Sequence, residues 1–182
     1  MREDTLFQFV GFETAVNLDD FTSQWENFAK KFFKQDIHAV TLQQQIKSKN
    51  RFRYMSMNEW PQDSFRFSFM EGRGSDYFPD HRVKVVQAGG YQQVHRECNN
   101  CAHDEIKILL MLDEGEAHRS AFNNMPFHHV NIYQAYYQSC LYSNIMEFFA
   151  EESQASELLD QLKKHFLHCD VGMYRECLVL EG

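Results

Sequence analysis

The sequence predicts an α+β fold in which short strands and amphipathic helices follow the order βαββαβ over residues 1–95. Two observations support this prediction. Apolar residues recur at strand period in 39–47, 51–60 and 83–94. Four large apolar residues instead recur every three or four positions, which is the spacing of one helix face: Phe21, Trp25, Phe28 and Phe32.

The elements follow in chain order. In residues 6–16, aromatic and apolar residues occupy both odd and even positions, which indicates a strand covered on both faces. The stretch NLDD then supplies helix caps and an acidic first turn. After two strands, Pro61 begins a second helix, with Phe65 and Phe69 on its buried side. The strand at 83–94 contains two glycines, which indicate a bulge.

This order is that of the ferredoxin-like split unit, four antiparallel strands with two helices on one face. In the second half we expect strands at 105–114, 129–139 and 171–181, and a helix over 144–168. That set is an incomplete or rearranged second ferredoxin-like half. The predicted domains are therefore 1–95, a connecting loop at 96–104 and a second α+β part at 105–182.

Residues 51–69, RFRYMSMNEWPQDSFRFSF, resemble the third strand and second helix of the dimeric α/β-barrel superfamily. The resemblance is to domains of the antibiotic-biosynthesis-monooxygenase type, on a strand ending in Glu59 and Trp60 and a helix beginning near Phe65. It implies a barrel built from two ferredoxin-like units, either in a homodimer or within one chain as an internal pseudo-dimer. It also implies a cavity for a small apolar or aromatic ligand.

The haem-degrading branch of the superfamily is similar at SDYFPDHRV, where His81 falls at the place of the iron ligand. The chain departs from that branch in two ways. Phe69 stands where the branch has a second Trp, and residues 6–16 contain no Asn. We therefore expect no haem. The candidate catalytic residues are His81, Trp60 and Asn58, with His81 as the cofactor ligand only if haem binds. In the alternative interpretation Trp60 is a core anchor and His81 is solvated.

The stretch HRECNNCAHD contains a Cys-x-x-Cys pair, Cys98 and Cys101, flanked by His95 and His103. This spacing allows two thiolates to bind one zinc ion, but structural zinc usually needs a second ligand pair from elsewhere. The alternative is a connecting loop with exposed thiols. A redox-active pair would open a helix after a strand, whereas a strand is expected after this loop.

Charge and composition exclude other classes. Hydrophobic residues make up 43% of the chain, so a packed core is expected. The net charge is −8, and residues 95–182 carry all of the excess with 14 acidic and 6 basic residues. Such a half repels phosphate backbones, so we expect no nucleic-acid partner. No apolar run reaches about 18 residues, so no membrane span is expected.

These patterns predict a cytoplasmic small-ligand-binding protein. Its activity could be that of a monooxygenase, either cofactor-independent or haem-dependent. The alternatives are a non-enzymatic binding or interaction protein of the same fold and a small zinc-binding protein. The cytoplasmic prediction follows from an N-terminus unlike a signal peptide and an odd count of five cysteines.

Overall fold

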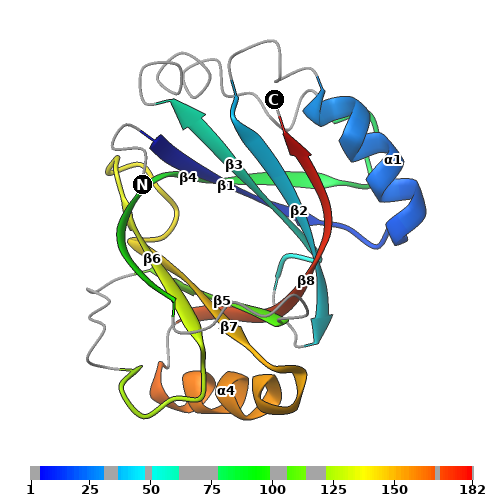
Figure 1. Cartoon of the computed structure of the whole chain (residues 1–182). Coiled ribbons are helices and arrows are strands. Elements are labelled where there is room, and N and C mark those ends of the chain that lie inside the picture. Colours follow the sequence, from blue (N-terminus) through cyan, green and yellow to red (C-terminus); the bar gives the residue numbers. More distant parts are fainter. Residues whose placement is uncertain are drawn as a thin grey trace. The chain divides into compact units, whose positions relative to one another are not determined.

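The structure is a computed structural model that describes residues 5–30, 37–47, 51–61, 78–98, 106–113, 122–166 and 169–181. Within these ranges the chain forms eight strands and two helices, which Figure 1 labels. In order they are β1 (Thr5–Glu13), α1 (Leu18–Ala29), β2 (Ala39–Lys47), β3 (Tyr54–Pro61), β4 (Lys84–Cys98), β5 (Ile106–Leu112), β6 (His129–Ala135), β7 (Asn144–Ala150), α4 (Glu152–His165) and β8 (Cys169–Glu181). The described part is thus mostly β-strand with two helices, which agrees with the predicted α+β class.

The chain divides into two compact units that share strands. Unit 1 consists of Met1–Gln44, Arg51–Tyr91 and Glu176–Gly182, and unit 2 consists of Gln45–Asn50 and Gln92–Arg175. Both boundaries at Tyr91 and Arg175 fall inside strands, β4 and β8. The domain boundaries predicted from the sequence, with a loop at 96–104, stay a prediction.

The sheet of unit 1 has the strand order β4-β1-β3-β2, and all of its neighbours are antiparallel. The strands expected at 39–47 and within 51–60 are confirmed as β2 and β3. Pro61, the expected start of the second helix, is the last residue of β3. The rest of that helix, with Phe65 and Phe69, lies outside the described residues.

Helix α1 covers one face of the sheet of unit 1 with aromatic side chains. The Asn17 side chain caps the helix by accepting a hydrogen bond from the Asp20 backbone at 2.9 Å. Phe21 then stacks on Tyr54 of β3, with ring centroids 4.0 Å apart, and meets Phe12 of β1 edge to face. Three residues of the predicted helix stripe, Phe21, Trp25 and Phe28, therefore lie on the buried face of α1.

Glycine has specific roles at two positions in unit 1. The register of β1 against β4 shifts between Phe9 and Val10, opposite Gly89, whose φ of 124° lies in the region that glycine favours. This is the glycine break that the sequence indicated. Gly11 lies against the ring of Phe52, and a Cβ atom at Gly11 would lie 2.4 Å from that ring. A side chain at Gly11 would therefore displace a fully buried aromatic.

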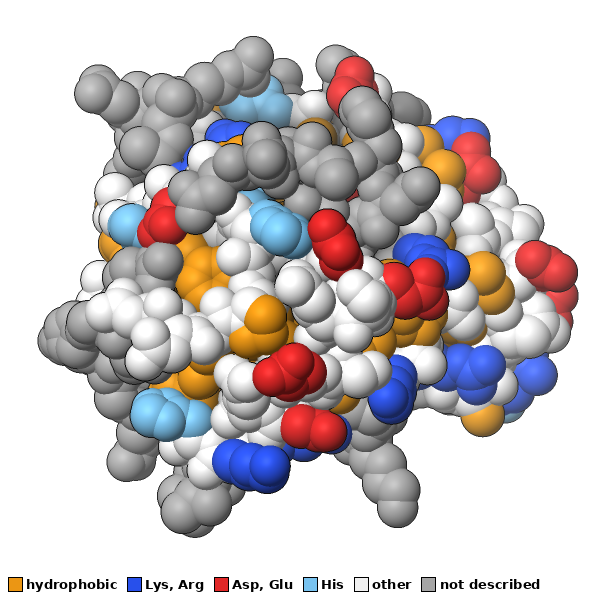
Figure 2. All heavy atoms as spheres, turned by 60° about the horizontal axis from the view of Figure 1, so that its bottom comes forward, with side chains coloured by type: hydrophobic (Ala, Val, Ile, Leu, Met, Phe, Trp, Pro, Cys, Tyr) orange, Lys and Arg blue, Asp and Glu red, His pale blue; other side chains and the backbone are white. Residues whose placement is uncertain are grey.

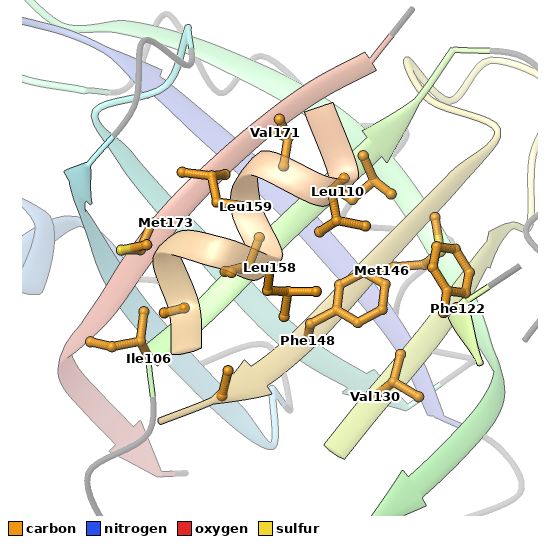
Figure 3. Close-up of a cluster of buried hydrophobic side chains, with 14 of the residues drawn as sticks. Ile106, Leu110, Phe122, Val130, Met146, Phe148, Leu158, Leu159, Val171 and Met173 are labelled. Carbon is orange, nitrogen blue, oxygen red and sulfur yellow. The ribbon is translucent and has the colours of Figure 1, made fainter. Parts of the chain in front are cut away.

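The sheet of unit 2 has the strand order β8-β5-β7-β6, again fully antiparallel. Each unit thus orders its strands as last, first, third and second along the chain. Helix α4 packs on one face of the unit 2 sheet, where Figure 3 shows Leu158 and Leu159 of α4 beside Leu110 of β5 and Phe148 of β7. The strand residues on this face are fully buried, so α4 is held by apolar contact.

One element was predicted wrongly. The helix expected over 144–168 is a strand, β7, followed by helix α4. The first part contains Ile145, Phe148 and Phe149, which fit helical spacing. However, β7 is buried almost throughout, because α4 covers one face and the other face is also shielded. A strand buried on both faces has no alternation from which it can be recognised.

The surface carries charges of both signs. On the face shown in Figure 2, acidic and basic side chains lie interspersed with small apolar areas. Neither α1 nor α4, the two helices of the described part, has the length and apolarity that crossing a bilayer requires.

Candidate functional site

A cluster of polar side chains lies on the sheet of unit 1, on the face that also carries α1. The register pairs Gln8 with Asn58, and places Trp60 opposite Leu6 two residues further along β3. Paired residues of antiparallel strands point to the same face, and so do residues two apart on one strand. Gln8, Asn58 and Trp60 therefore share a face with Phe12, which packs against α1.

Hydrogen bonds join these side chains into one group, which we call the amide–indole cluster (Gln8, Ser56, Asn58 and Trp60). The Gln8 Oε1 atom accepts from Asn58 Nδ2 at 3.0 Å and from Trp60 Nε1 at 3.1 Å. Ser56 Oγ donates to Asn58 Oδ1 at 2.7 Å. All four residues are buried. Two of the predicted catalytic residues, Asn58 and Trp60, are thus joined through Gln8, which the sequence analysis did not single out.

The chemistry of the amide–indole cluster is limited to hydrogen bonding. An amide, a hydroxyl and an indole N–H can orient an oxygen atom of a small molecule, and aromatic side chains nearby can contact its rings. None of the four side chains changes its protonation state near neutral pH. The cluster therefore offers hydrogen bonding alone, and a reaction that moves a proton needs a base from elsewhere.

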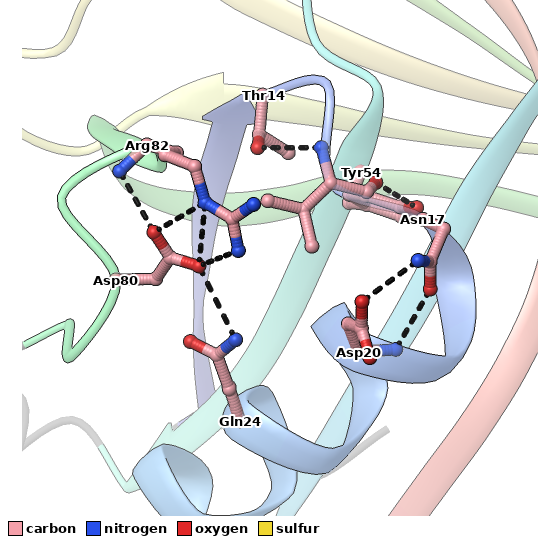
Figure 4. A network of polar contacts seen from close by, with 8 residues as sticks. Thr14, Asn17, Asp20, Gln24, Tyr54, Asp80 and Arg82 are labelled. Carbon is pink, nitrogen blue, oxygen red and sulfur yellow. Dashed lines mark hydrogen bonds and ion pairs between the residues drawn. The ribbon is translucent and has the colours of Figure 1, made fainter.

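His81, the third predicted catalytic residue, lies in an exposed turn before β4. Its neighbour Asp80 accepts hydrogen bonds from the Arg82 backbone and guanidinium and from Gln24 of α1, as Figure 4 shows. The hydrogen bonds from Arg82 hold the pKa of the Asp80 carboxyl far below its usual range. These contacts fix the turn around His81 and leave its imidazole at the surface.

A haem site is not assembled by the described residues around His81. Its side chain is exposed, and no described hydrogen bond orients its ring. Histidine ligands of metals normally donate their second N–H to a neighbouring group. His81 does not fit that pattern here, and the expectation that no haem binds stays a prediction.

The proposed zinc residues fall partly outside the described chain. Cys101 and His103 are among the residues that the structure does not describe. Cys98 is disulfide-bonded, so it offers no thiolate in this state. His95 and Cys98 lie on the extended strand β4, three residues apart, so their side chains point to opposite faces. Binding one ion with both residues therefore requires β4 to open at its end.

Sequence reasoning missed a second polar cluster, in unit 2, because it assigned β7 to a helix. We call it the Glu147 cluster; it consists of Lys107, His129, Asn131, Tyr133 and Glu147, all buried. Phe149 of β7 lies opposite both Lys107 of β5 and His129 of β6. Glu147, two residues before Phe149 on β7, lies opposite Asn131 of β6. All of these residues therefore share one face of the sheet. The α4 core lies on the other face. The sequence did contain a signal for this cluster, because polar side chains alternate along β6 at His129, Asn131 and Tyr133.

Glu147 is the centre of this cluster. Its Oε2 atom accepts from Tyr133 at 2.7 Å and from Asn131 at 3.1 Å, and Lys107 Nζ lies 3.1 Å from its Oε1 atom. Burial by itself would raise the pKa of the Glu147 carboxyl, but the Lys107 ammonium and the two hydrogen bonds outweigh it and lower that pKa. Glu147 is therefore a buried carboxylate that stays ionised.

Comparison with solved structures shows two proteins of similar fold. One is an anthrone oxidase-like protein, with a TM-score of 0.61 and 7% identity, covering 99% of this chain and 94% of that chain. Another is a proposed monooxygenase of Fusobacterium nucleatum subsp. nucleatum ATCC 25586, with a TM-score of 0.54 and 8% identity, covering 100% and 96%. No protein-family model matches the chain, and no curated protein matches it. At these identities the likeness establishes the fold, which is shared with monooxygenase-like proteins.

Proposed function

We propose that this protein binds a small, largely aromatic molecule and oxidises it with dioxygen, as a monooxygenase-like enzyme without a metal or haem. The observation that carries the proposal is the amide–indole cluster, a buried polar group on a sheet face rich in aromatic side chains. Small-molecule sites combine apolar walls with a few polar groups in this way. The fold shared with an anthrone oxidase-like protein adds support.

The architecture of the superfamily belongs to the same proposal. Both units order four strands as last, first, third and second, which is the order of a ferredoxin-like unit. This repetition supports an internal pseudo-dimer of two ferredoxin-like halves within one chain. A homodimer of the whole chain remains the alternative arrangement.

One observation favours a second candidate function, that of a binding protein without catalysis. The amide–indole cluster contains no group that can accept a proton near neutral pH. A protein of this kind would bind the same aromatic ligand through Asn58 and Gln8 and release it unchanged. Oxygen uptake distinguishes the two functions, because only the enzyme consumes dioxygen.

Anthrone is a suitable probe, because it is the aromatic molecule named in a protein of this fold. Oxidation of anthrone consumes one O₂ and yields anthraquinone and water, and both oxygen uptake and anthraquinone absorbance can be followed. We expect Asn58→Leu to weaken anthrone binding by about tenfold, which corresponds to the loss of one buried hydrogen bond of about 1.4 kcal/mol. Asn27→Ala, at an exposed amide of α1, is the matched control and leaves binding unchanged.

The outcomes separate the candidates. Saturable binding with oxygen uptake supports the enzyme, and saturable binding without oxygen uptake supports the binding protein. Binding that Asn58→Leu does not alter would remove the amide–indole cluster from the proposal. Absence of any saturable binding of anthrone and of related hydroxylated tricyclic aromatics would overturn both.

A further inference from the structure

The further inference concerns Gln43 of β2, on the face of the unit 1 sheet that points away from α1. Tyr54 stacks on Phe21 of α1, so its neighbour Met55 points to the opposite face of the sheet. The register places Gln43 opposite Met55, and residues opposite each other on antiparallel strands share a face. Gln43 therefore lies on the reverse side of the sheet from the amide–indole cluster.

The side chain of Gln43 is buried without a hydrogen-bond partner. The residue is 1% exposed, and neither its Nε2 nor its Oε1 atom is paired with any residue that the structure describes. By contrast, the buried amide of Gln8, on the other face of the same sheet, accepts two hydrogen bonds. An unpaired buried donor or acceptor is costly, and buried polar groups normally have partners. A donor and an acceptor side by side, both unused, fit a bound molecule that carries the complementary pair.

Exposure on this face decreases in three steps toward Gln43. The register defines three rows across β2, β3 and β1, which are Ala39, Glu59 and Phe7, then Thr41, Met57 and Phe9, and then Gln43, Met55 and Gly11. All residues of the first row are partly exposed. In the second row only Met57 is partly exposed, and the third row is buried. Solvent therefore reaches one end of this face, and the Gln43 amide lies at the buried end.

Aromatic side chains lie on the same face as Gln43. The Phe52 ring lies where a Cβ atom of Gly11 would point, so it covers part of the third row. Phe9, in the second row, meets Tyr91 edge to face with ring centroids 5.5 Å apart. The polar Gln43 amide thus shares its face with large apolar groups, and this combination is typical of small-molecule sites.

Charge on this face favours a neutral ligand. Glu59 is the acidic residue of the three rows, and the rows contain no basic residue. A carboxylate would be repelled by Glu59 and has no N–H to donate to the Oε1 atom of Gln43. A primary carboxamide or a lactam carries an N–H and a C=O side by side and has no charge. The chemical complement of the Gln43 side chain is therefore another amide.

We propose that Gln43 binds a neutral primary carboxamide or lactam that is attached to an aromatic or apolar group. The ligand N–H donates to Gln43 Oε1, and Gln43 Nε2 donates to the ligand carbonyl, so two hydrogen bonds form one cyclic pair. This site lies on the face of the unit 1 sheet opposite α1. It is separate from the amide–indole cluster and does not depend on the proposed oxidation.

Two probes that differ in one feature test this pairing by calorimetric titration. Benzamide has both the N–H and the carbonyl, whereas N,N-dimethylbenzamide has no N–H. We expect benzamide to bind saturably and to bind about tenfold more tightly than N,N-dimethylbenzamide, which corresponds to one buried hydrogen bond. Gln43→Met removes both hydrogen bonds and should weaken benzamide binding by at least about tenfold. Gln44→Met is the matched control, because Gln44 lies opposite Tyr54 and so points to the α1 face.

Two further measurements do not depend on the affinity of the variants. Without ligand, Gln43→Met should raise the midpoint of thermal unfolding by about 2–4 °C, because it removes an unpaired buried amide. A glutamine with only a structural role would show a lowered midpoint instead. In the unaltered protein, benzamide should shift the ¹⁵N–¹H signals of the Gln43 side chain, and this readout requires no folded variant.

The outcomes decide the inference separately from the proposed function. Equal affinity for the two probes, or benzamide binding that Gln43→Met leaves unchanged, overturns the site. Benzamide binding that Asn58→Leu removes and Gln43→Met does not would belong to the amide–indole cluster and would also overturn it. Absence of saturable benzamide binding overturns the site at Gln43 whatever the result with anthrone, since anthrone tests the opposite face of the sheet.

Discussion

Lys107 Nζ lies 3.1 Å from Glu147 Oε1 in the sheet of unit 2, and both side chains are almost wholly buried. Removal of one partner leaves a buried charge without compensation. We expect Lys107→Met and Glu147→Gln each to lower the free energy of unfolding by about 3–5 kcal/mol. The double variant should lose clearly less than the sum of the two, because it leaves no charge behind. Urea unfolding of the four proteins gives the coupling energy, and additive losses would contradict the pairing.

The lowered pKa of Glu147 predicts how stability depends on pH. The folded-state pKa lies below the ordinary value of 4.5, so the stability that Glu147 contributes is fully present above pH 4.5. This contribution is lost as the pH falls from that value through the lower, folded-state pKa. The Lys107→Met, Glu147→Gln double variant should lose stability less steeply over that acidic range. Equal slopes for the two proteins between about pH 5 and pH 3 would show that Glu147 does not contribute.

Trp60 and Trp25 form a matched pair for the amide–indole cluster. Both are 1% exposed, but Trp60 donates a hydrogen bond to Gln8, whereas Trp25 donates none to the described residues. We expect Trp60→Phe to cost about 1 kcal/mol more than Trp25→Phe, because only the former loses a buried hydrogen bond. Anthrone affinity should fall in Trp60→Phe alone. Equal effects in both variants would reduce Trp60 to a core anchor.

Gly11 predicts a steric effect that a second substitution relieves. The Cβ atom of Gly11→Ala would lie 2.4 Å from the Phe52 ring, so we expect a loss of about 1–3 kcal/mol from overpacking. Phe52→Leu alone should also be destabilising, because it leaves a cavity. The double variant should be more stable than the sum of the single effects predicts. Thermal unfolding measures this coupling, and strict additivity would contradict the contact.

Zinc binding at the Cys-x-x-Cys stretch should depend on reduction. Because Cys98 is disulfide-bonded, we expect the protein purified without reductant to bind less than about 0.1 equivalent of zinc. If Cys98, Cys101, His95 and His103 form a site, reduction should raise zinc uptake and release protons. Cys98→Ser should abolish that uptake, and Cys177→Ser, at an exposed cysteine of β8, is the control. Zinc content that does not change after reduction would favour the connecting loop with exposed thiols over the zinc site.

The sequence predicted the elements of unit 1 better than those of unit 2, for a physical reason. β3 and α1 each bury one face, and so their periods of 2 and 3.6 are visible. β7 is buried on both faces, so its period is hidden and it was assigned to the helix that follows. The Glu147 cluster was lost with it, since its central carboxylate lies on β7. Trp60 was found by resemblance and Asn58 by its position on the predicted strand, whereas Gln8 could be found only from the register of β1.

The sharing of β8 between the two units has a consequence for synthesis on the ribosome. Residues 176–182 belong to unit 1, which otherwise consists of residues from the first half of the chain. They are translated after every residue of unit 2. Unit 1 therefore stays incomplete on the ribosome until all of unit 2 has been translated. A mutation or truncation that removes β8 therefore damages unit 1 as well as unit 2, although the rest of unit 1 lies in the first half of the chain.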